Sequence, residues 1–93
     1  MITPAQCRAA RALLDWTQGD LAKATNLSVV TIRAFEKGSE MRDSNRTLLI
    51  LAFERAGVQF IPENGGGVGV RLQKGPRTDE GLRPDELSAE NDA

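Results

Sequence analysis

Residues 17–38, TQGDLAKATNLSVVTIRAFEKG, contain two short helical segments that are separated by only three residues. Thr17 and Ser28 each stand immediately before one of these segments, where a hydroxyl side chain caps the first turn of a helix. Gly38 follows the second segment, at the position where a glycine commonly ends a helix. The two predicted helices span Gln18–Thr25 and Val29–Lys37.

The connection between these helices has the features of a helix-turn-helix motif. Ala22 is small enough for two helices to cross closely, and Asn26 tolerates the positive φ that a tight turn requires. Leu21, Leu27 and Ile32 supply a small apolar wedge between the helices. In such a motif the second helix lies across the major groove of DNA. The segment therefore predicts a nucleic-acid-binding unit.

A further helix is predicted before the motif, from Pro4 to Asp15. Thr3 is its N-cap, Pro4 occupies the first helical position and Gln6 completes a capping box. One face of this helix carries the apolar residues Cys7, Ala10 and Leu14. We interpret Cys7 as a small buried apolar residue rather than a reactive thiol.

A fourth helix is predicted after the polar loop 39–43. Asp43 or Ser44 is expected to cap it, and the helix continues through Ala56 to a terminating Gly57. Its apolar positions include Leu48, Ile50, Leu51 and Phe53.

The character of the chain changes after the fourth helix. Residues 58–61 and 68–72 are β-prone and enclose a turn with three consecutive glycines, which predicts a β-hairpin. The last twenty residues contain six acidic side chains and only two leucines, a composition typical of disorder. We therefore predict a helix-turn-helix domain (1–57), a hairpin that forms a dimer (58–73) and a disordered acidic tail (74–93).

Composition narrows the class of protein further. A chain of 93 residues forms one small domain, and no apolar run is long enough to span a bilayer or serve as a signal peptide. One cysteine and no histidine leave no ligand set for zinc and remove the commonest general base. We expect a cytoplasmic binding module that is not an enzyme and needs no metal or cofactor.

The net charge of −1 is unevenly distributed along the chain. Residues 1–60 carry eight Lys or Arg against six Asp or Glu, whereas residues 61–93 carry four against seven. A mildly basic front and an acidic end are compatible with a nucleic-acid-binding domain that has a solvated tail. A split of this size also arises by chance, so charge permits this function without identifying it.

The quoted stretch resembles the Cro and lambda-repressor-like family of DNA-binding domains, also called the Xre family. The likeness covers about residues 3–57 and rests on Thr17-Gln18, Leu21-Ala22, Ser28-x-x-Thr31-Ile32 and Glu36-x-Gly38. Asn26 stands where the family usually has glycine, and it can adopt the same backbone conformation. The resemblance implies a mainly α fold of four to five helices and a function in DNA binding.

The resemblance also implies a role for each matching residue. Positions that face base edges hold Val29, Val30, Arg33 and Ala34, after Ser28 at the start of the helix. Positions that contact the DNA backbone hold Gln18, Thr31, Lys37, Ser44, Asn45 and Arg46. Arg11 and Glu36 match a pair that forms a salt bridge between the first and third helices.

Each of these roles has a simpler alternative. Val29 and Val30 could both be packing residues, but two adjacent residues of a helix cannot both face the core. At least one valine is therefore exposed, where it could meet a thymine methyl group. Arg33 could be an ordinary solvated arginine, although arginine to guanine is the commonest specific contact.

The preferred reading is a dimeric transcriptional repressor that binds double-stranded operator DNA near its own gene. The alternative is an antitoxin-type protein whose C-terminal part also binds a partner protein. A third reading, a helix-turn-helix protein that has lost DNA binding, rests on the low total charge.

Overall fold

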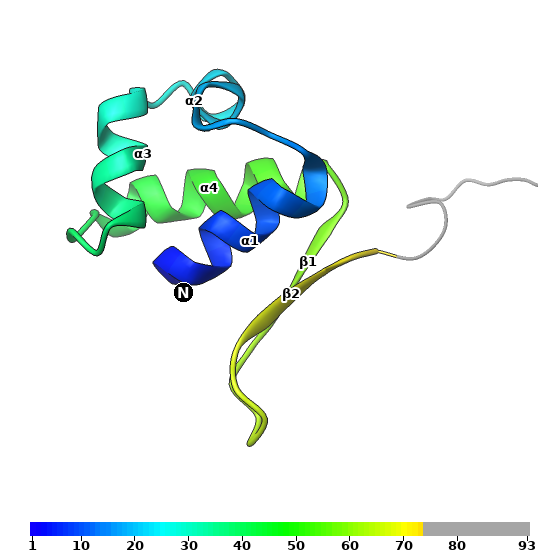
Figure 1. Cartoon of the computed structure of the whole chain (residues 1–93). Coiled ribbons are helices and arrows are strands. Elements are labelled where there is room, and N and C mark those ends of the chain that lie inside the picture. Colours follow the sequence, from blue (N-terminus) through cyan, green and yellow to red (C-terminus); the bar gives the residue numbers. More distant parts are fainter. Residues whose placement is uncertain (74–93) are drawn as a thin grey trace, which may run out of the picture.

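A computed structural model describes residues 1–73, which form four helices followed by a two-stranded antiparallel sheet (Figure 1). The elements are α1 (Pro4–Leu14), α2 (Gln18–Thr25), α3 (Val29–Glu36), α4 (Asp43–Arg55), β1 (Val58–Ile61) and β2 (Gly69–Leu72). The predicted mainly α fold with a C-terminal hairpin is confirmed. The disorder predicted for 74–93 lies outside the described residues. Within the described part, no helix has the length and apolar character needed to cross a membrane.

The first two helices begin with reciprocal hydrogen bonds between a threonine and the residue three positions later. Thr3 Oγ1 accepts from the Gln6 backbone N–H at 3.1 Å, and Gln6 Oε1 accepts from the Thr3 N–H at 3.0 Å. Thr17 and Asp20 make the same pair of bonds at the start of α2. Each bond satisfies an N–H group that has no partner within its helix. The predicted N-caps Thr3 and Thr17 are therefore confirmed.

The start of α4 differs from the prediction. Arg42 is the N-cap residue and its side chain makes no capping hydrogen bond, so the prediction that Asp43 or Ser44 caps this helix was wrong. The helix begins earlier because the Arg42 carbonyl already accepts from the N–H groups of Asn45 and Arg46. Asp43 becomes the first helical residue, where its carboxylate lies at the positive end of the helix dipole.

The core lies among the helices, and its largest buried side chains are Leu21, Ile32, Phe35, Leu49 and Phe53. The Trp16 ring stacks on Phe53 with 5.8 Å between centroids, and Phe60 meets Phe53 edge-on at 6.1 Å. These three rings join α4 to the hairpin and to the chain before α2. Two of the apolar positions noted in the α4 sequence, Leu48 and Leu51, face solvent instead.

One face of the hairpin packs on the helices. Register pairs Val58 with Leu72 and Phe60 with Val70, so these four side chains share one face. Val58 is buried, and Phe60 and Val70 pack against the core. Most of this face is therefore part of the domain's own core, and Leu72 at its end is exposed.

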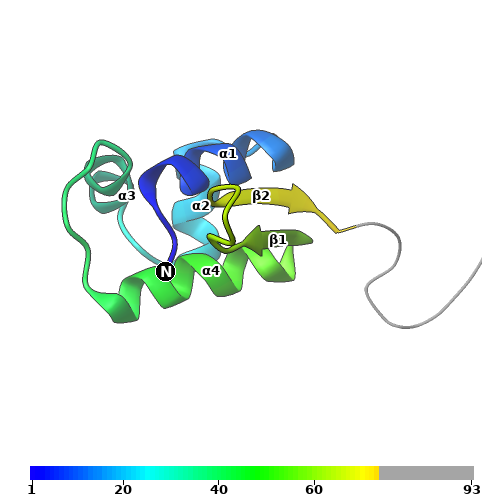
Figure 2. The same ribbon diagram turned by 90° about the horizontal axis from the view of Figure 1, so that it is seen from below.

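The other face of the hairpin is polar and exposed at Gln59 and Arg71, whereas Ile61 and Gly69 on the same face are half-buried. Gln59 lies opposite Arg71 there, and the Arg71 Nε donates to Gln59 Oε1 at 2.9 Å. Figure 2 shows β2 beside α1 and β1 beside α4. The Gln6 Nε2 group on α1 donates to the Gly69 carbonyl at 2.9 Å, which ties β2 to the helices.

Candidate nucleic-acid interface

The turn between α2 and α3 has the geometry that the sequence predicts. Asn26 adopts φ 62° and ψ 22°, the left-handed conformation that redirects the chain within three residues. Leu21 and Ile32 are fully buried in the core, and the partly buried Leu27 and Ala22 pack against that core. Because these contacts fix α3 on one side, its other side is presented to solvent.

The two sides of α3 differ sharply in composition. Ile32, Phe35 and Glu36 are buried. Val30 is 65% exposed and Arg33 is exposed, whereas Val29 is only half-buried. The remaining predicted site residues of this helix, Thr31 and Ala34, are also half-buried. The exposed valine expected from the sequence is therefore Val30.

The hydroxyl groups at the start of α3 are already paired with each other. Ser28 Oγ accepts from the Thr31 backbone N–H at 3.0 Å and donates to Thr31 Oγ1 at 2.9 Å. Ser28 thus acts first as the cap that fixes the first turn of α3.

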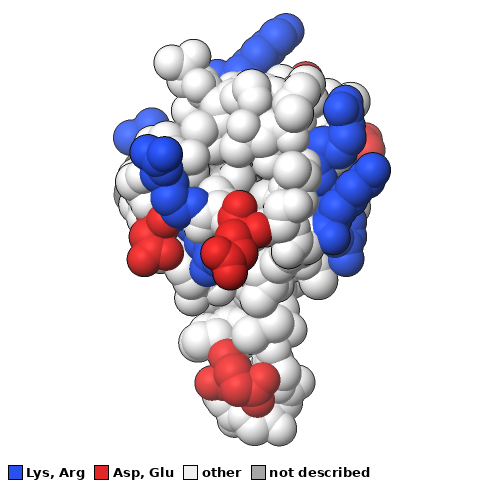
Figure 3. Space-filling model, turned by 90° about the vertical axis from the view of Figure 1, so that its left-hand side faces the viewer, with Lys and Arg blue, Asp and Glu red and all other residues white. Residues whose placement is uncertain are grey.

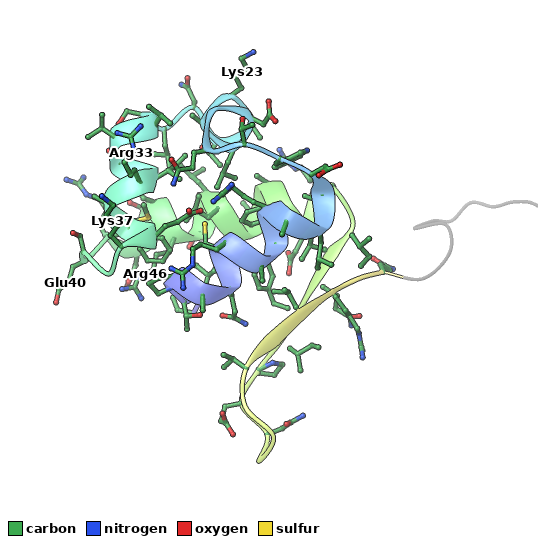
Figure 4. The ribbon with its side chains drawn as sticks, viewed as in Figure 1. Lys23, Arg33, Lys37, Glu40 and Arg46 are labelled. Atoms are coloured by element: carbon green, nitrogen blue, oxygen red, sulfur yellow. The ribbon has the colours of Figure 1, made fainter. Side chains whose placement is uncertain are left out.

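Cationic side chains lie around this exposed side. Lys23 on α2, Arg33 on α3 and Lys37 at the end of α3 point away from the helices, with Glu40 on the following loop (Figure 4). Figure 3 shows Lys and Arg at the two flanks of this side of the molecule, with acidic side chains between them in the lower part of the body and uncharged surface above. Cations at both flanks suit a duplex, whose phosphates border each groove, whereas the acidic side chains between them would not favour phosphate.

A buried carboxylate connects α3 to the two preceding helices. The Glu36 side chain is 3% exposed and forms a salt bridge with Arg11, whose Nη2 lies 2.8 Å from Glu36 Oε1. Arg11 Nε also donates to Glu36 Oε2 at 2.8 Å. Gln18 Nε2 donates to Oε1 at 3.0 Å and the Cys7 thiol donates to Oε2 at 3.1 Å. The predicted Arg11–Glu36 pair is present, and it also orients Gln18 at the start of α2.

This network changes the pKa of both acidic groups within it. Burial alone would raise the pKa of Glu36, but the hydrogen bonds from Arg11, Gln18 and Cys7 outweigh burial and hold it below its ordinary value. Burial, together with the neighbouring carboxylate, raises the pKa of the Cys7 thiol far above its ordinary value. Cys7 therefore remains a protonated donor, in keeping with a packing role.

A family model described as helix-turn-helix matches residues 8–52, from α1 to near the end of α4. This match makes residues 8–52 an Xre-type, lambda-repressor-like helix-turn-helix domain. No curated protein matches the chain. Members of the family are DNA-binding regulatory domains, and this Xre-family protein is accordingly a DNA-binding transcription regulator. The family match ends before the hairpin, which lies outside it.

The Xre-family protein presents its remaining predicted contacts at the start of α4. Ser44 is exposed, while Asn45 and Arg46 are half-buried. The Arg46 guanidinium lies 5.8 Å from the centroid of the Phe35 ring, a cation–π contact that holds it against α3. Its Nε is buried and has no hydrogen-bond partner among residues 1–73. Arg46 is therefore a partly packed cation rather than a freely solvated one.

Two contributors to the site were missed by the sequence analysis. The Arg8 Nη1 group donates to the Glu36 backbone carbonyl at the end of α3. The Phe35 ring makes a cation–π contact with the Arg46 guanidinium. Both contacts join residues that are distant in the chain, so no local pattern signals them. Together they fix the C-terminal end of α3 to α1 and α4.

Proposed function

We propose that this Xre-family regulator is a dimeric repressor that reads operator half-sites with α3 in the major groove. The observation that carries this proposal is the exposed side of α3, which presents Val30 and Arg33, with the exposed Lys23 on α2 and Lys37 at the end of α3. An arginine can bond two acceptors of guanine, and an exposed valine can pack against a thymine methyl group.

The proposal gives the site residues two kinds of role. Those that face base edges are Val29, Val30, Arg33 and Ala34, with Ser28 as a further DNA-binding residue at the start of the helix. Those that contact phosphates and sugars are Gln18, Thr31, Lys37, Ser44, Asn45 and Arg46. The bond from Gln18 to Glu36 supports the second role, because it fixes the Gln18 amide at the start of a helix, where phosphates bind well.

The proposal includes a dimer because a single helix-turn-helix contacts only part of an operator. One α3 covers a single half-site, and two copies would read half-sites about one helical turn apart. A dimer seated on DNA just upstream of its own gene would repress by occupying the promoter.

A binding titration on that upstream DNA tests this function. We expect the full chain to bind it more tightly than a scrambled duplex, with affinity that falls steeply as salt rises. Absence of binding at low salt, where phosphate contacts are strongest, would instead support a helix-turn-helix protein that has lost DNA binding.

The alternative function is that of an antitoxin-type protein that binds DNA and a partner protein. It is favoured by the exposed apolar residues of the hairpin, Val68 and Leu72, which lie outside the family match. Co-expression with the product of the adjacent gene tests it, because an antitoxin would form a stoichiometric complex with that product.

A further inference from the structure

The turn of the hairpin brings an asparagine, a carboxylate and three glycines together. This turn, residues 62–68, connects β1 to β2 at the projecting end of the hairpin, and all of its residues are exposed (Figure 1). Asn64 is followed directly by Gly65, which has no side chain to shield its backbone nitrogen. Attack of that nitrogen on the Asn64 side-chain carbon closes a five-membered ring, which is the favoured size for an intramolecular reaction. The turn therefore contains an amide beside an unhindered nucleophile.

A carboxylate contacts the nitrogen that would make this attack. Glu63 Oε2 accepts from the Gly65 backbone N–H at 3.0 Å and from the Gly67 N–H at 3.1 Å. The Gly65 nitrogen has to lose its proton in order to bond to carbon. A side chain within hydrogen-bond reach of a proton that must be removed has the position of a general base. Glu63 occupies that position.

A second contact involves the oxygen that gains charge in the same reaction. Asn64 Oδ1 accepts from the Gly66 backbone N–H at 3.3 Å. Attack on the Asn64 side-chain carbon moves negative charge onto Oδ1, so the Gly66 N–H is aimed at the atom where charge develops. The nucleophile, its base and the donor to the oxyanion thus lie within residues 63–66.

We propose that Asn64 is a site of self-modification, at which the Gly65 nitrogen closes a succinimide with Glu63 as the base. A bond forms between the Gly65 nitrogen and Asn64 Cγ, and the bond between Cγ and Nδ2 breaks. The proton taken from the nitrogen passes through Glu63 to the departing group, which leaves as ammonia. Water then opens the imide at one carbonyl to give aspartate or at the other to give isoaspartate. No atom is oxidised or reduced.

Two other asparagines among residues 1–73 lack this arrangement and serve as internal references. The nitrogen after Asn26 donates to the Thr25 hydroxyl at 3.3 Å, and the nitrogen after Asn45 donates to the Arg42 carbonyl at 3.1 Å within α4. Both asparagines precede residues with large side chains, which crowd the attacking nitrogen. The same molecule therefore allows Asn64 to be compared with asparagines whose neighbouring nitrogen bonds to a neutral oxygen.

The products alter a turn that is linked to the core. Aspartate places a second carboxylate beside Glu63, and isoaspartate also adds one carbon to the backbone of the turn. The turn joins the strands where Ile61 pairs with Gly69, and Phe60 and Val70 of the next pair pack against the core. Modified chains should therefore melt at a lower temperature than unmodified ones. This inference concerns the hairpin alone and does not depend on DNA binding.

Timed incubation of the full-length chain at neutral pH tests the inference. Peptide mapping by mass spectrometry, with enzymatic methylation to detect isoaspartate, follows each asparagine. We expect Asn64 to convert while Asn26 and Asn45 persist. E63Q still offers an oxygen to the Gly65 N–H but is a far weaker base, so it should convert roughly tenfold more slowly or worse. E54Q is the matched control, since Glu54 is exposed on α4 and should leave the rate unchanged.

The same chain unfolded in urea separates the effect of the fold from that of the Asn-Gly sequence. The folded chain should convert faster, because unfolding disperses the base and the oxyanion donor without changing the sequence. A folded chain that converts no faster than the unfolded one overturns the inference. Equal rates for wild type and E63Q also overturn it, as does a faster E63Q, which would show that Glu63 protects Asn64. Thermal melts confirm that E63Q and E54Q are folded during the incubation.

Discussion

Val30 on α3 and Val68 on the arm, the projecting end of the hairpin (residues 61–69), are both exposed valines, yet they lie on surfaces of opposite character. Val30 is 65% exposed on a side of the molecule bordered by Lys23 and Lys37. Val68 is 47% exposed and forms one wall of an apolar groove. Exposure alone would class the two side chains together. Their neighbours distinguish them, because cations favour a phosphate-bearing partner and apolar walls favour an apolar one.

The two surfaces also differ in how they are held in place. α3 is anchored from below by the hydrogen bonds to Glu36 and by the Arg8 bond at its C-terminal end. The arm is held only at its base, by the bond from Gln6 to Gly69, and by the bonds within its own turn. α3 and its exposed side are therefore held firmly by other helices, whereas the arm projects from the body of the domain.

The largest expected effect is a loss of folding stability when the Glu36 side chain, which holds α3 to α1 and α2, is removed. E36A deletes the acceptor for Arg11, Gln18 and Cys7 and leaves the partly buried Arg11 guanidinium without a carboxylate partner. We expect a loss of about 3–5 kcal/mol in the free energy of unfolding, measured by urea denaturation. E40A is the control, since Glu40 is exposed on the loop and should change stability by less than about 0.5 kcal/mol. Equal stability of the two variants would show that the network does not anchor α3.

The second effect concerns base reading by α3. R33A should cost about 1–3 kcal/mol in operator binding and relax the preference at one base pair of each half-site. K37A should weaken binding to all sequences alike and lower the salt slope by about one. R71A is the control for charge, because Arg71 is exposed on the hairpin and should leave operator preference intact. An R33A protein that kept both affinity and preference would show that α3 is wrongly placed in the groove.

The two valines can be compared directly by the same substitution. V30S should lose about 1 kcal/mol of operator affinity, and it should no longer distinguish a half-site thymine from uracil, which lacks the methyl group. V68S should leave that thymine preference unchanged, because Val68 lies on the arm and not on α3. Fluorescence anisotropy on thymine and uracil duplexes measures affinity and preference for both variants. If V30S keeps the thymine preference, Val30 does not contact the methyl group.

The helix-turn-helix could be predicted because the information that specifies it is local. Thr17, Ser28 and Gly38 act on their own turns, and Asn26 alone decides the conformation between the helices. The same locality explains the error at α4. A favourable cap residue such as Asp43 predicts a helix start, but the carbonyl of Arg42 had already begun the helix.

The site and the hairpin could be predicted only in part, because their decisive contacts are long-range. The bond from Cys7 to Glu36 spans 29 residues, and the Phe35–Arg46 stack joins two helices across a loop. No spacing rule connects such pairs. The choice between Val29 and Val30 likewise depended on which side of α3 meets the core.

The smallest expected effect is a pH dependence of stability that arises from Glu36. Its pKa is lowered in the folded chain, so the carboxylate binds protons more readily when the chain is unfolded. The stabilisation is complete above the ordinary glutamate value of about 4.3 and is lost as the pH falls through the folded pKa. The loss should be smaller than for E36A, since a protonated Glu36 keeps its volume and still accepts hydrogen bonds. Urea midpoints from pH 7 to pH 3 should therefore fall more steeply for the wild type than for E36Q, which lacks this titration while the other carboxylates remain. Parallel profiles would show that the Glu36 network stabilises the fold through packing rather than through charge. The electrostatic anchoring that distinguishes α3 from the arm would then be removed from the comparison.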